Sequence, residues 1–206
     1  MALSATDVDG DDVTFSASVD GNGSASVDGT TLTVSPAADY NGDITVTVSA
    51  SDGTLAGNSS FTLTVTPVND APVITAIADQ SADEDTTFVF DVTASDVDGD
   101  DLTYSATNGN ATITVDGNTL TVVPESNYVG DSVITVIVSD GTDSSTSTFT
   151  LTFNPVNDAP VLDAIADGST DEDTAFVMSL SSSDVDGDDV TYSASASNGS
   201  ASVDGG

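Results

Sequence analysis

Three copies of one acidic hexapeptide, Asp-Val-Asp-Gly-Asp-Asp, are the residues of this chain best suited to do chemistry. They occupy residues 7–12, 96–101 and 184–189. The carboxylates are closely spaced, and the glycine at the fourth position permits a tight reversal of the backbone. Short carboxylates held in such a turn can converge on one cation. We therefore expect each hexapeptide to form part of a cation-binding loop.

The charge of the chain is entirely negative. Its 206 residues contain no Lys, Arg or His, whereas 32 Asp and three Glu give a formal charge of −35. No side chain can neutralise phosphates, which excludes binding of nucleic acid or of an anionic membrane by charge attraction. Self-repulsion must be relieved by cations from solution. A solubilising acidic coat is the alternative, but such a coat would use Glu freely and would not concentrate Asp in turns.

Calcium suits these residues better than other metals. It is a hard cation that accepts six to eight oxygen ligands in flexible geometry, whereas magnesium demands a stricter octahedron. Transition metals prefer His or Cys, and the chain contains neither. The loop is not an EF-hand, because glycine falls at position 4 rather than 6 and no Glu stands at position 12. The open alternative is an acidic Asx-turn without an ion.

Other motifs return with a period of 88 residues, which indicates domain-sized repeats. Pro-Val-Asn-Asp-Ala-Pro occupies residues 67–72 and 155–160, and Asp-Glu-Asp-Thr occupies residues 83–86 and 171–174. The chain contains no Cys, no signal peptide and no apolar stretch long enough to insert into a membrane. We expect it to be an interior part of a longer protein.

Apolar residues alternate with Ser and Thr along the complete repeat, which is the period of half-buried strands. Tyr128, just before a strand, resembles the tyrosine corner of immunoglobulin-like sandwiches. Seven short strands in one repeat predict a Greek-key β-sandwich. The expected strands lie near residues 73–78, 88–94, 102–106, 111–115, 119–123, 132–138 and 147–153.

Counting strands predicts which acidic loops meet. Loops separated by an even number of strands lie at the same end of a sandwich. The linker 66–72, the hexapeptide 96–101 and the turn at residues 139–141 should therefore meet at one end. The loop 83–85 should lie at the opposite end, near the linker 155–160.

Together these motifs resemble cadherin-type repeats. The Asn-Asp-Ala-Pro linker, the Asp-x-Asp loop before a Leu-Thr-Tyr-Ser strand, the acidic loop 83–85 and the Ser-Asp-Gly turn 139–141 carry the resemblance. It is closest to the cadherin-like tandem repeats of large bacterial surface adhesins and of repeats-in-toxin-type proteins. The mid-domain Asp-Arg-Glu motif of animal cadherins is absent, so fewer ions are expected at each junction. Asp83, Asp85 or acidic residues near 125 are further candidate ligands.

The resemblance implies an all-β chain of tandem immunoglobulin/cadherin-like Greek-key sandwiches. We expect an N-terminally truncated repeat at residues 1–70, a complete repeat at 71–158 and a C-terminally truncated repeat at 159–206. The third should be the least stable, because half a sandwich cannot bury both inner faces. Whether the truncated ends of two molecules complete each other is left open.

The resemblance also implies calcium ligands at two junctions between repeats. At the first junction they are Asn69, Asp70, Asp96, Asp98 and Asp140. At the second they are Glu84, Asn157, Asp158, Asp184 and Asp186.

The function expected from these features is a calcium-stiffened spacer, or stalk segment, of a large extracellular adhesin that is secreted or held at a bacterial cell surface. Its partners would be neighbouring repeats, with cell-surface or extracellular ligands bound through domains outside this segment. The alternative is an adhesion module that recognises glycan, ice or a partner protein through its Ser/Thr faces. An enzyme is disfavoured, because only paired carboxylates could act and the Asp-Glu-Asp loop recurs in successive repeats.

Overall fold

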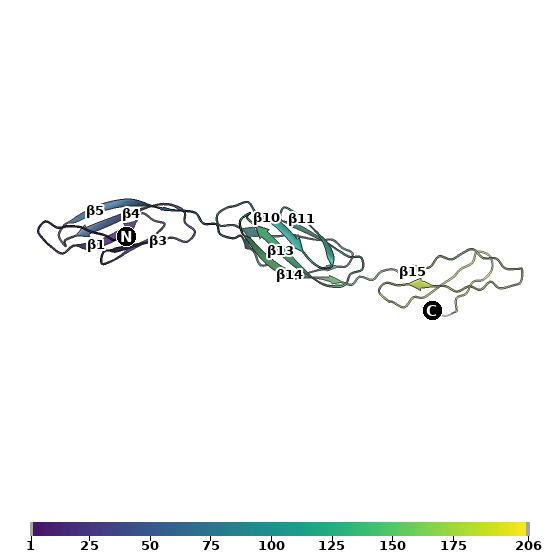
Figure 1. Ribbon diagram of the computed structural model, residues 1–206. Coiled ribbons are helices and arrows are strands. Elements are labelled where there is room, and N and C mark those ends of the chain that lie inside the picture. Colours follow the sequence, from purple (N-terminus) through teal and green to yellow (C-terminus); the bar gives the residue numbers. More distant parts are fainter. Residues whose placement is uncertain (1, 205–206) are drawn as a thin grey trace. The chain divides into compact units, whose positions relative to one another are not determined.

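The computed structural model describes residues 2–204, which fold into strands and turns (Figure 1). Met1 and residues 205–206, the outer limits of the first and third expected repeats, lie outside the described residues. The strands are β1 (Thr14–Val19), β2 (Gly23–Asp28), β3 (Thr31–Pro36), β4 (Gly42–Ser51), β5 (Ala56–Val65), β6 (Val73–Ile74), β7 (Gln80–Asp83), β8 (Phe88–Asp91), β9 (Ala94–Ser95), β10 (Thr103–Thr107), β11 (Ala111–Asp116), β12 (Thr119–Pro124), β13 (Gly130–Ser139), β14 (Ser144–Asn154), β15 (Val161–Leu162) and β16 (Ser182–Ser183). The chain is therefore all-β over its described residues, as expected.

Two compact units divide the chain. The first comprises residues 1–73 together with the segments 94–103 and 138–145. The second comprises the remainder, namely residues 74–93, 104–137 and 146–206. Each unit thus combines residues that are far apart in the sequence, and each contains one of the two expected clusters of acidic loops.

The first unit carries two small antiparallel sheets. One has the order β1-β4-β5, and the other pairs β2 with β3. Alternate side chains of these strands point inward, which follows from the two-residue period of a strand. Leu32, Ile44 and Val46 are buried at the centre of the core, and partly buried apolar side chains from all five strands pack around them.

The strands between residues 73 and 154 form two larger sheets. One has the order β10-β13-β14-β7, and the other has the order β11-β12-β8. Apolar side chains that alternate with Ser, Thr and Asp line the space between them. The fully or almost fully buried members are Val92, Leu120, Val122, Ile134, Val136, Val138, Phe149, Leu151 and Phe153. They alternate along their strands, as the two-residue period predicts.

The first expected strand of this repeat, residues 73–78, is wrong in its bounds. The structure divides it into β6, which pairs with β9, and β7, which pairs in parallel with β14. The chain therefore passes from one sheet to the other through residues 75–79. Alternation of apolar residues cannot reveal such a passage, because it reports which side of a strand is buried and not which neighbour the strand pairs with.

Two tyrosines fix the corner before the long central strands. Tyr128 donates a hydrogen bond from its hydroxyl to the Asp131 carbonyl at 2.8 Å, and Tyr40 does the same to Asp43 at 2.8 Å. These bonds hold the loop before β13 and before β4 against its own strand. Both bonds reach a carbonyl three residues downstream, whereas the tyrosine corner expected from the sequence would bond to an upstream residue.

Residues 159–204 have little regular structure. They contain only β15 and β16, two residues each, which pair with one another. None of the described residues in this stretch is buried. The apolar side chains of this stretch therefore form no buried core among the described residues.

Replacing Leu151 by Ala should destabilise the second repeat by about 2–5 kcal/mol, because Leu151 is fully buried and its truncation leaves a cavity. Val133→Ala is the control, because Val133 is 58% exposed. Urea denaturation followed by circular dichroism measures both. Equal midpoints for the two variants would contradict the assigned core.

Candidate metal centre

The linker that follows β5 brings two polar side chains to the loops of the next repeat. Asn69 donates from its Nδ2 to the carboxylates of Asp140 at 3.0 Å and Asp143 at 2.9 Å. The backbone N–H of Asp70 donates to Oδ2 of Asp98 at 2.8 Å. All of these residues lie within the first unit. The linker is thereby tied both to the hexapeptide and to the turn after β13.

The hexapeptide forms a tight Asx-type loop around one carboxylate. Oδ1 of Asp96 accepts hydrogen bonds from the backbone N–H groups of Asp98 at 2.9 Å and Gly99 at 3.1 Å. Gly99 has a φ of 82°, a conformation that glycine adopts without steric cost. The other oxygen of Asp96, Oδ2, is buried and has no hydrogen-bond partner.

Three carboxylates of this loop converge. Oxygens of Asp96, Asp98 and Asp100 lie within 4.8 Å of one another. Backbone N–H groups satisfy only the Oδ1 side of Asp96, so its orphaned Oδ2 remains an uncompensated acceptor. A buried acceptor without a partner is costly, and a cation with oxygen ligands would satisfy it. We call the residues Asn69, Asp70, Asp96, Asp98, Asp100, Asp140 and Asp143 the first cluster.

The second cluster lies in the second unit and consists of Glu84, Asn157, Asp158, Asp184 and Asp186. Glu84 is only 3% exposed, and its Oε1 accepts from the backbone N–H of Val156 at 2.8 Å. The backbone N–H of Asp158 donates to Oδ2 of Asp186 at 2.6 Å. Oxygens of Glu84, Asp158 and Asp186 lie within 4.8 Å of one another.

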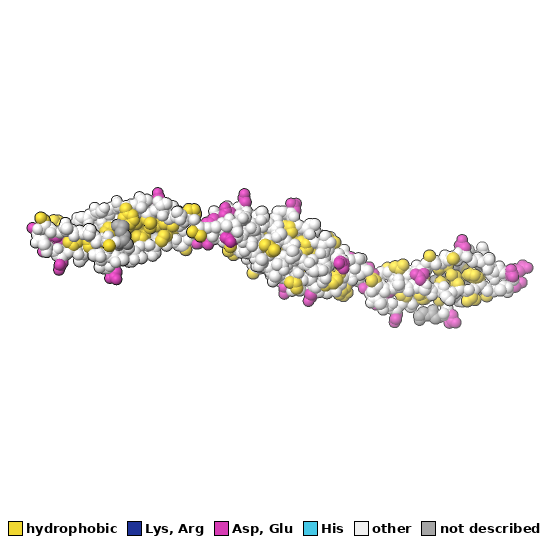
Figure 2. All heavy atoms as spheres, in the orientation of Figure 1, with side chains coloured by type: hydrophobic (Ala, Val, Ile, Leu, Met, Phe, Trp, Pro, Cys, Tyr) yellow, Lys and Arg dark blue, Asp and Glu magenta, His cyan; other side chains and the backbone are white. Residues whose placement is uncertain are grey.

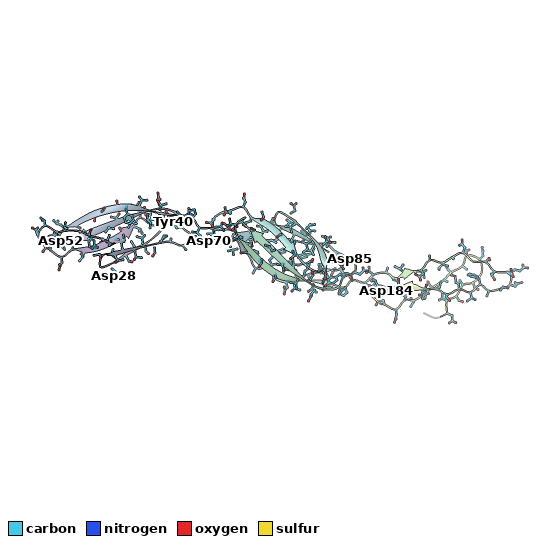
Figure 3. The ribbon with its side chains drawn as sticks, in the orientation of Figure 1. Asp28, Tyr40, Asp52, Asp70, Asp85 and Asp184 are labelled. Atoms are coloured by element: carbon cyan, nitrogen blue, oxygen red, sulfur yellow. The ribbon has the colours of Figure 1, made fainter. Side chains whose placement is uncertain are left out.

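One oxygen of Asp158 is left without a partner. Its Oδ2 is buried and accepts no hydrogen bond, as with Asp96 in the first cluster. Asp85, at the end of the same loop as Glu84, and Asp184 both lie near the connector that follows β14 (Figure 3). Five carboxylates therefore surround a short piece of backbone.

The two clusters are counterparts 88 residues apart. Asp158 bonds to Asp186 through its backbone N–H in the same way that Asp70 bonds to Asp98. The positions 88 residues before Glu84 and 88 residues after Asp140 fall outside residues 1–206.

Like charges shift the titration of the linker carboxylates. Burial, then the negative charges of Asp186, Asp85, Glu84 and Asp184, raise the pKa of Asp158 above its ordinary value of 3.8. Burial, then Asp39, Asp98 and Asp96, raise the pKa of Asp70 in the same way.

The Asp140 carboxylate shifts in the opposite direction. Its hydrogen bonds from the Asn69 amide, and then from the backbone N–H groups of Asp143 and Thr142, lower its pKa below 3.8. Asp140 is therefore stabilised as an anion by hydrogen-bond donors, whereas Asp70 and Asp158 are crowded by other anions. An added cation would therefore be attracted most strongly to the surroundings of Asp70 and Asp158.

Both clusters fit a calcium ion. The first supplies converging carboxylate oxygens from one loop and the second from three segments, and each has an orphaned buried oxygen. Hard oxygen donors without imidazole or thiolate are the ligand set that calcium prefers.

Of the ten ligands expected from the sequence, the structure brings most into contact. Asn69, Asp70, Asp98 and Asp140 are joined directly, and Asp96 adjoins them through its own loop. The Nδ2 of Asn157 donates to the carbonyl of Asp158 at 2.9 Å, as the Nδ2 of Asn69 does to that of Asp70 at 3.3 Å. Asp184 accepts from the backbone N–H groups of its own loop, as Asp96 does in the first cluster.

Two residues of the first cluster were missed. Asp100 was not singled out, although alternate Asp residues in each hexapeptide could have indicated it. Asp143 carried no such signal, because the residue 88 positions earlier is Leu55 and the repeat therefore does not preserve it. Its role follows only from the Asn69 amide, which reaches both Asp140 and Asp143.

Comparison with known families assigns two segments of the chain. Residues 2–66 match the cadherin-like domain, and residues 69–154 match the bacterial Ig domain. Both families consist of extracellular or surface modules of adhesion or structural type, and such domains are generally not enzymes. Cadherin-like domains commonly occur in tandem and generally bind calcium. No helix long and apolar enough to cross a membrane occurs among residues 2–204.

Individual proteins resemble parts of the chain. Chitinase A of Pseudoalteromonas piscicida is 34% identical over 112 residues, which are 50% of this chain and 13% of that protein. Human protocadherin-24 EC1-2 is 19% identical over 75% of this chain and 87% of that structure, with a TM-score of 0.47. An endo-fucoidan hydrolase of glycoside hydrolase family 107 is 24% identical over 72% of this chain and 24% of that structure, with a TM-score of 0.33. The chain thus spans a small part of two of these proteins.

In calcium-free solution Asp158 should titrate above pH 3.8 and Asp140 below it. Because the raised pKa favours the proton in the folded state, the contribution of Asp158 to stability is full at low pH and is lost as the pH rises through that pKa. The contribution of Asp140 is present above its unfolded pKa and is lost as the pH falls through its folded pKa. Carboxyl carbon NMR shifts followed against pH measure both values. The reverse order would contradict the described contacts.

Proposed function

We propose that this chain, whose residues 2–66 match the cadherin-like domain and whose residues 69–154 match the bacterial Ig domain, is a calcium-stiffened spacer of an extracellular protein. Calcium binds at the two clusters and holds each linker against the loops around it. The protein is secreted or held at a bacterial cell surface. Its repeats run over residues 1–70, 71–158 and 159–206, and each has its neighbours as partners.

The observation that carries this proposal is the orphaned carboxylate oxygen in each cluster. Asp158 keeps a buried oxygen without a partner beside Glu84 and Asp186, and Asp96 does so beside Asp98 and Asp100. In a chain without Lys, Arg or His, only a cation from solution can compensate these groups. The repetition of the arrangement after 88 residues favours a structural role over a single specialised site.

In the second cluster one ion would join three segments. Glu84 comes from the loop between β7 and β8, Asp158 from the linker after β14, and Asp186 from the following hexapeptide. Without the ion, the mutual repulsion of their carboxylates opposes this approach. With the ion, the same oxygens become ligands, and the linker is fixed relative to the loops on both sides. The ion thus replaces repulsion between the carboxylates by attraction of each carboxylate to the ion, and this stiffens the linker.

A second setting for the same role is favoured by the similarity to chitinase A, which covers half of this chain. In that setting the spacer would separate domains of a secreted polysaccharide hydrolase instead of an adhesin. We assign no catalytic role to the chain itself. Its acidic loops recur in successive repeats, and the chain contains no His, Cys, Lys or Arg to act with them.

Calcium should raise the melting temperature of the full chain, and Asp186→Asn should reduce that rise. Free calcium at about 100 times the dissociation constant of a site stabilises the bound state by about 2.7 kcal/mol. Replacing Asp186 by Asn removes one negative charge from the ligands of the ion, while the Asn amide oxygen can still accept from the Asp158 N–H. Differential scanning calorimetry in calcium and in chelator measures the rise.

Asp116→Asn is the matched control, because Asp116 ends β11 at an exposed turn outside both clusters. It should leave the calcium-dependent rise unchanged. Small-angle X-ray scattering on the same samples should give a longer maximum dimension in calcium than in chelator. Melting curves and scattering profiles that do not respond to millimolar calcium would refute the spacer proposal.

A further inference from the structure

A short motif that neither acidic cluster uses recurs at one position of the repeat. Asn22-Gly23-Ser24 returns 88 residues later as Asn110-Ala111-Thr112, and after a further 88 residues as Asn198-Gly199-Ser200. Each copy has an asparagine, one residue other than proline, and then a residue with a hydroxyl. This is the pattern at which a sugar is attached to an asparagine side chain.

The asparagine and the hydroxyl are retained while the residues around them change. The residue between them is Gly, Ala and Gly in the three copies, and the two residues before them are Asp-Gly, Asn-Gly and Ala-Ser. A Cβ at Gly23 would lie 2.6 Å from the Ser35 carbonyl oxygen, whereas Ala111 occupies the counterpart position in the next repeat. Ser and Thr are abundant in this chain, so a single copy would mean little. Retention at one position in three repeats is the informative feature.

A turn conformation does not explain why the asparagine is retained. Asn22 has a φ of 56°, in the left-handed region that Asn tolerates better than most residues. Asn110 and Asn198 are not among the described residues with a positive φ. The three asparagines therefore do not share a backbone conformation that requires Asn.

A shared hydrogen bond does not explain the retention either. The Nδ2 of Asn110 donates to the Tyr128 hydroxyl at 2.9 Å. Tyr40 is the counterpart of Tyr128 and makes the same bond to a carbonyl downstream, but it receives no hydrogen bond from Asn22 among the described residues. The side chain thus has different surroundings in the first two repeats.

Both ends of the motif are accessible in all three copies. The exposed side chains are Asn22, Ser24, Asn110, Thr112, Asn198 and Ser200. In the first two repeats the asparagine stands in the turn immediately before β2 or β11, and the hydroxyl residue is the second of that strand. The alternation of the strand turns that hydroxyl to the outer face. Most of the surface visible in Figure 2 is neither acidic nor hydrophobic, so a bulky polar group can project from it without covering a charge cluster or an apolar patch.

We propose that Asn22, Asn110 and Asn198 are attachment sites for N-linked sugars. The donor is a sugar joined through phosphate to a nucleotide or to a lipid carrier, and a glycosyltransferase of the producing cell catalyses the transfer. The Nδ2 of the asparagine bonds to the anomeric carbon C1 of the sugar. The bond from C1 to the phosphate oxygen breaks, its electron pair stays on the phosphate, and Nδ2 loses one proton.

The modified side chain remains compatible with the fold. A substituted amide keeps one N–H, which is enough for the bond from Asn110 to the Tyr128 hydroxyl. A fourth Asn-x-Ser sequence, Asn58-Ser59-Ser60, lies inside β5, where Asn58 pairs with Ser49. It is not repeated, because residue 146 is Thr, and it is not part of the proposal. The proposal shares with the proposed function only the extracellular setting of the chain.

Peptide mapping by electron-transfer mass spectrometry tests the assignment on the full chain isolated from the cells that produce it. We expect hexose or N-acetylhexosamine residues on at least two of the three asparagines. Asn118 is the internal control and should be unmodified, because it is exposed in a turn but has Leu120 at the third position. An added oligosaccharide of one defined mass indicates a lipid-linked donor, and stepwise addition of single hexoses indicates a nucleotide sugar. Sugar on fewer than two of the three positions, or on Ser and Thr alone, would overturn the proposal.

Variants of the hydroxyl residue show whether attachment depends on the motif. Thr112→Ala in the full chain should abolish the sugar on Asn110, whereas Thr112→Ser should keep it, because Ser stands at this position in the other two copies. Thr114→Ala is the matched control, since Thr114 is another exposed threonine of β11 outside the motif. A sugar on Asn110 that persists in Thr112→Ala would contradict recognition of the motif.

Calorimetry on the same samples separates this proposal from the spacer function. Sugar on the asparagines of a chain whose melting temperature does not respond to calcium overturns the spacer function and leaves the attachment sites standing. A calcium-dependent rise in a chain that carries no sugar does the reverse. The two proposals therefore fail independently.

Discussion

The repulsion between carboxylates that the backbone holds together is the constraint on which the rest of this structure depends. Oxygens of Glu84, Asp158 and Asp186 lie within 4.8 Å of one another in a chain that has no positively charged side chain. Backbone N–H groups of Val156 and Asp158 each satisfy one carboxylate. They also fix those carboxylates in place, so that the remaining oxygens face each other. Under the proposed function, a cation from solution relieves this repulsion and holds the linker.

The apolar sandwich and the acidic ends have separate tasks. Between the sheets, residues such as Ile134, Val136 and Leu151 are buried as completely as in any small domain, and Ser and Thr cover the outer faces without charge. The clustered carboxylates that could bind a cation lie in loops and linkers between strands. The strands consequently hold the loops a fixed distance apart, which is what a spacer requires.

The repeat and the alternation of apolar residues were enough to predict the sandwich, its core and the meeting of the linker with the hexapeptide. Those features depend on periods of 88 and of two residues, which a single sequence displays. The division of the first strand into β6 and β7 could not be predicted, because the alternation of apolar residues does not depend on which strand is the pairing partner. Asp143 could not be predicted either, since only the Asn69 amide that reaches it reveals its place.

Isothermal titration of calcium into the metal-free full chain tests the central claim most directly. The orphaned oxygens of Asp96 and Asp158 belong to two different clusters, so the account predicts saturable binding of at least two ions per chain. Magnesium at the same concentration should compete poorly, because it demands a stricter octahedral geometry and retains its waters. Absence of saturable calcium binding, or equal displacement by magnesium, would contradict the assignment of the clusters as calcium sites.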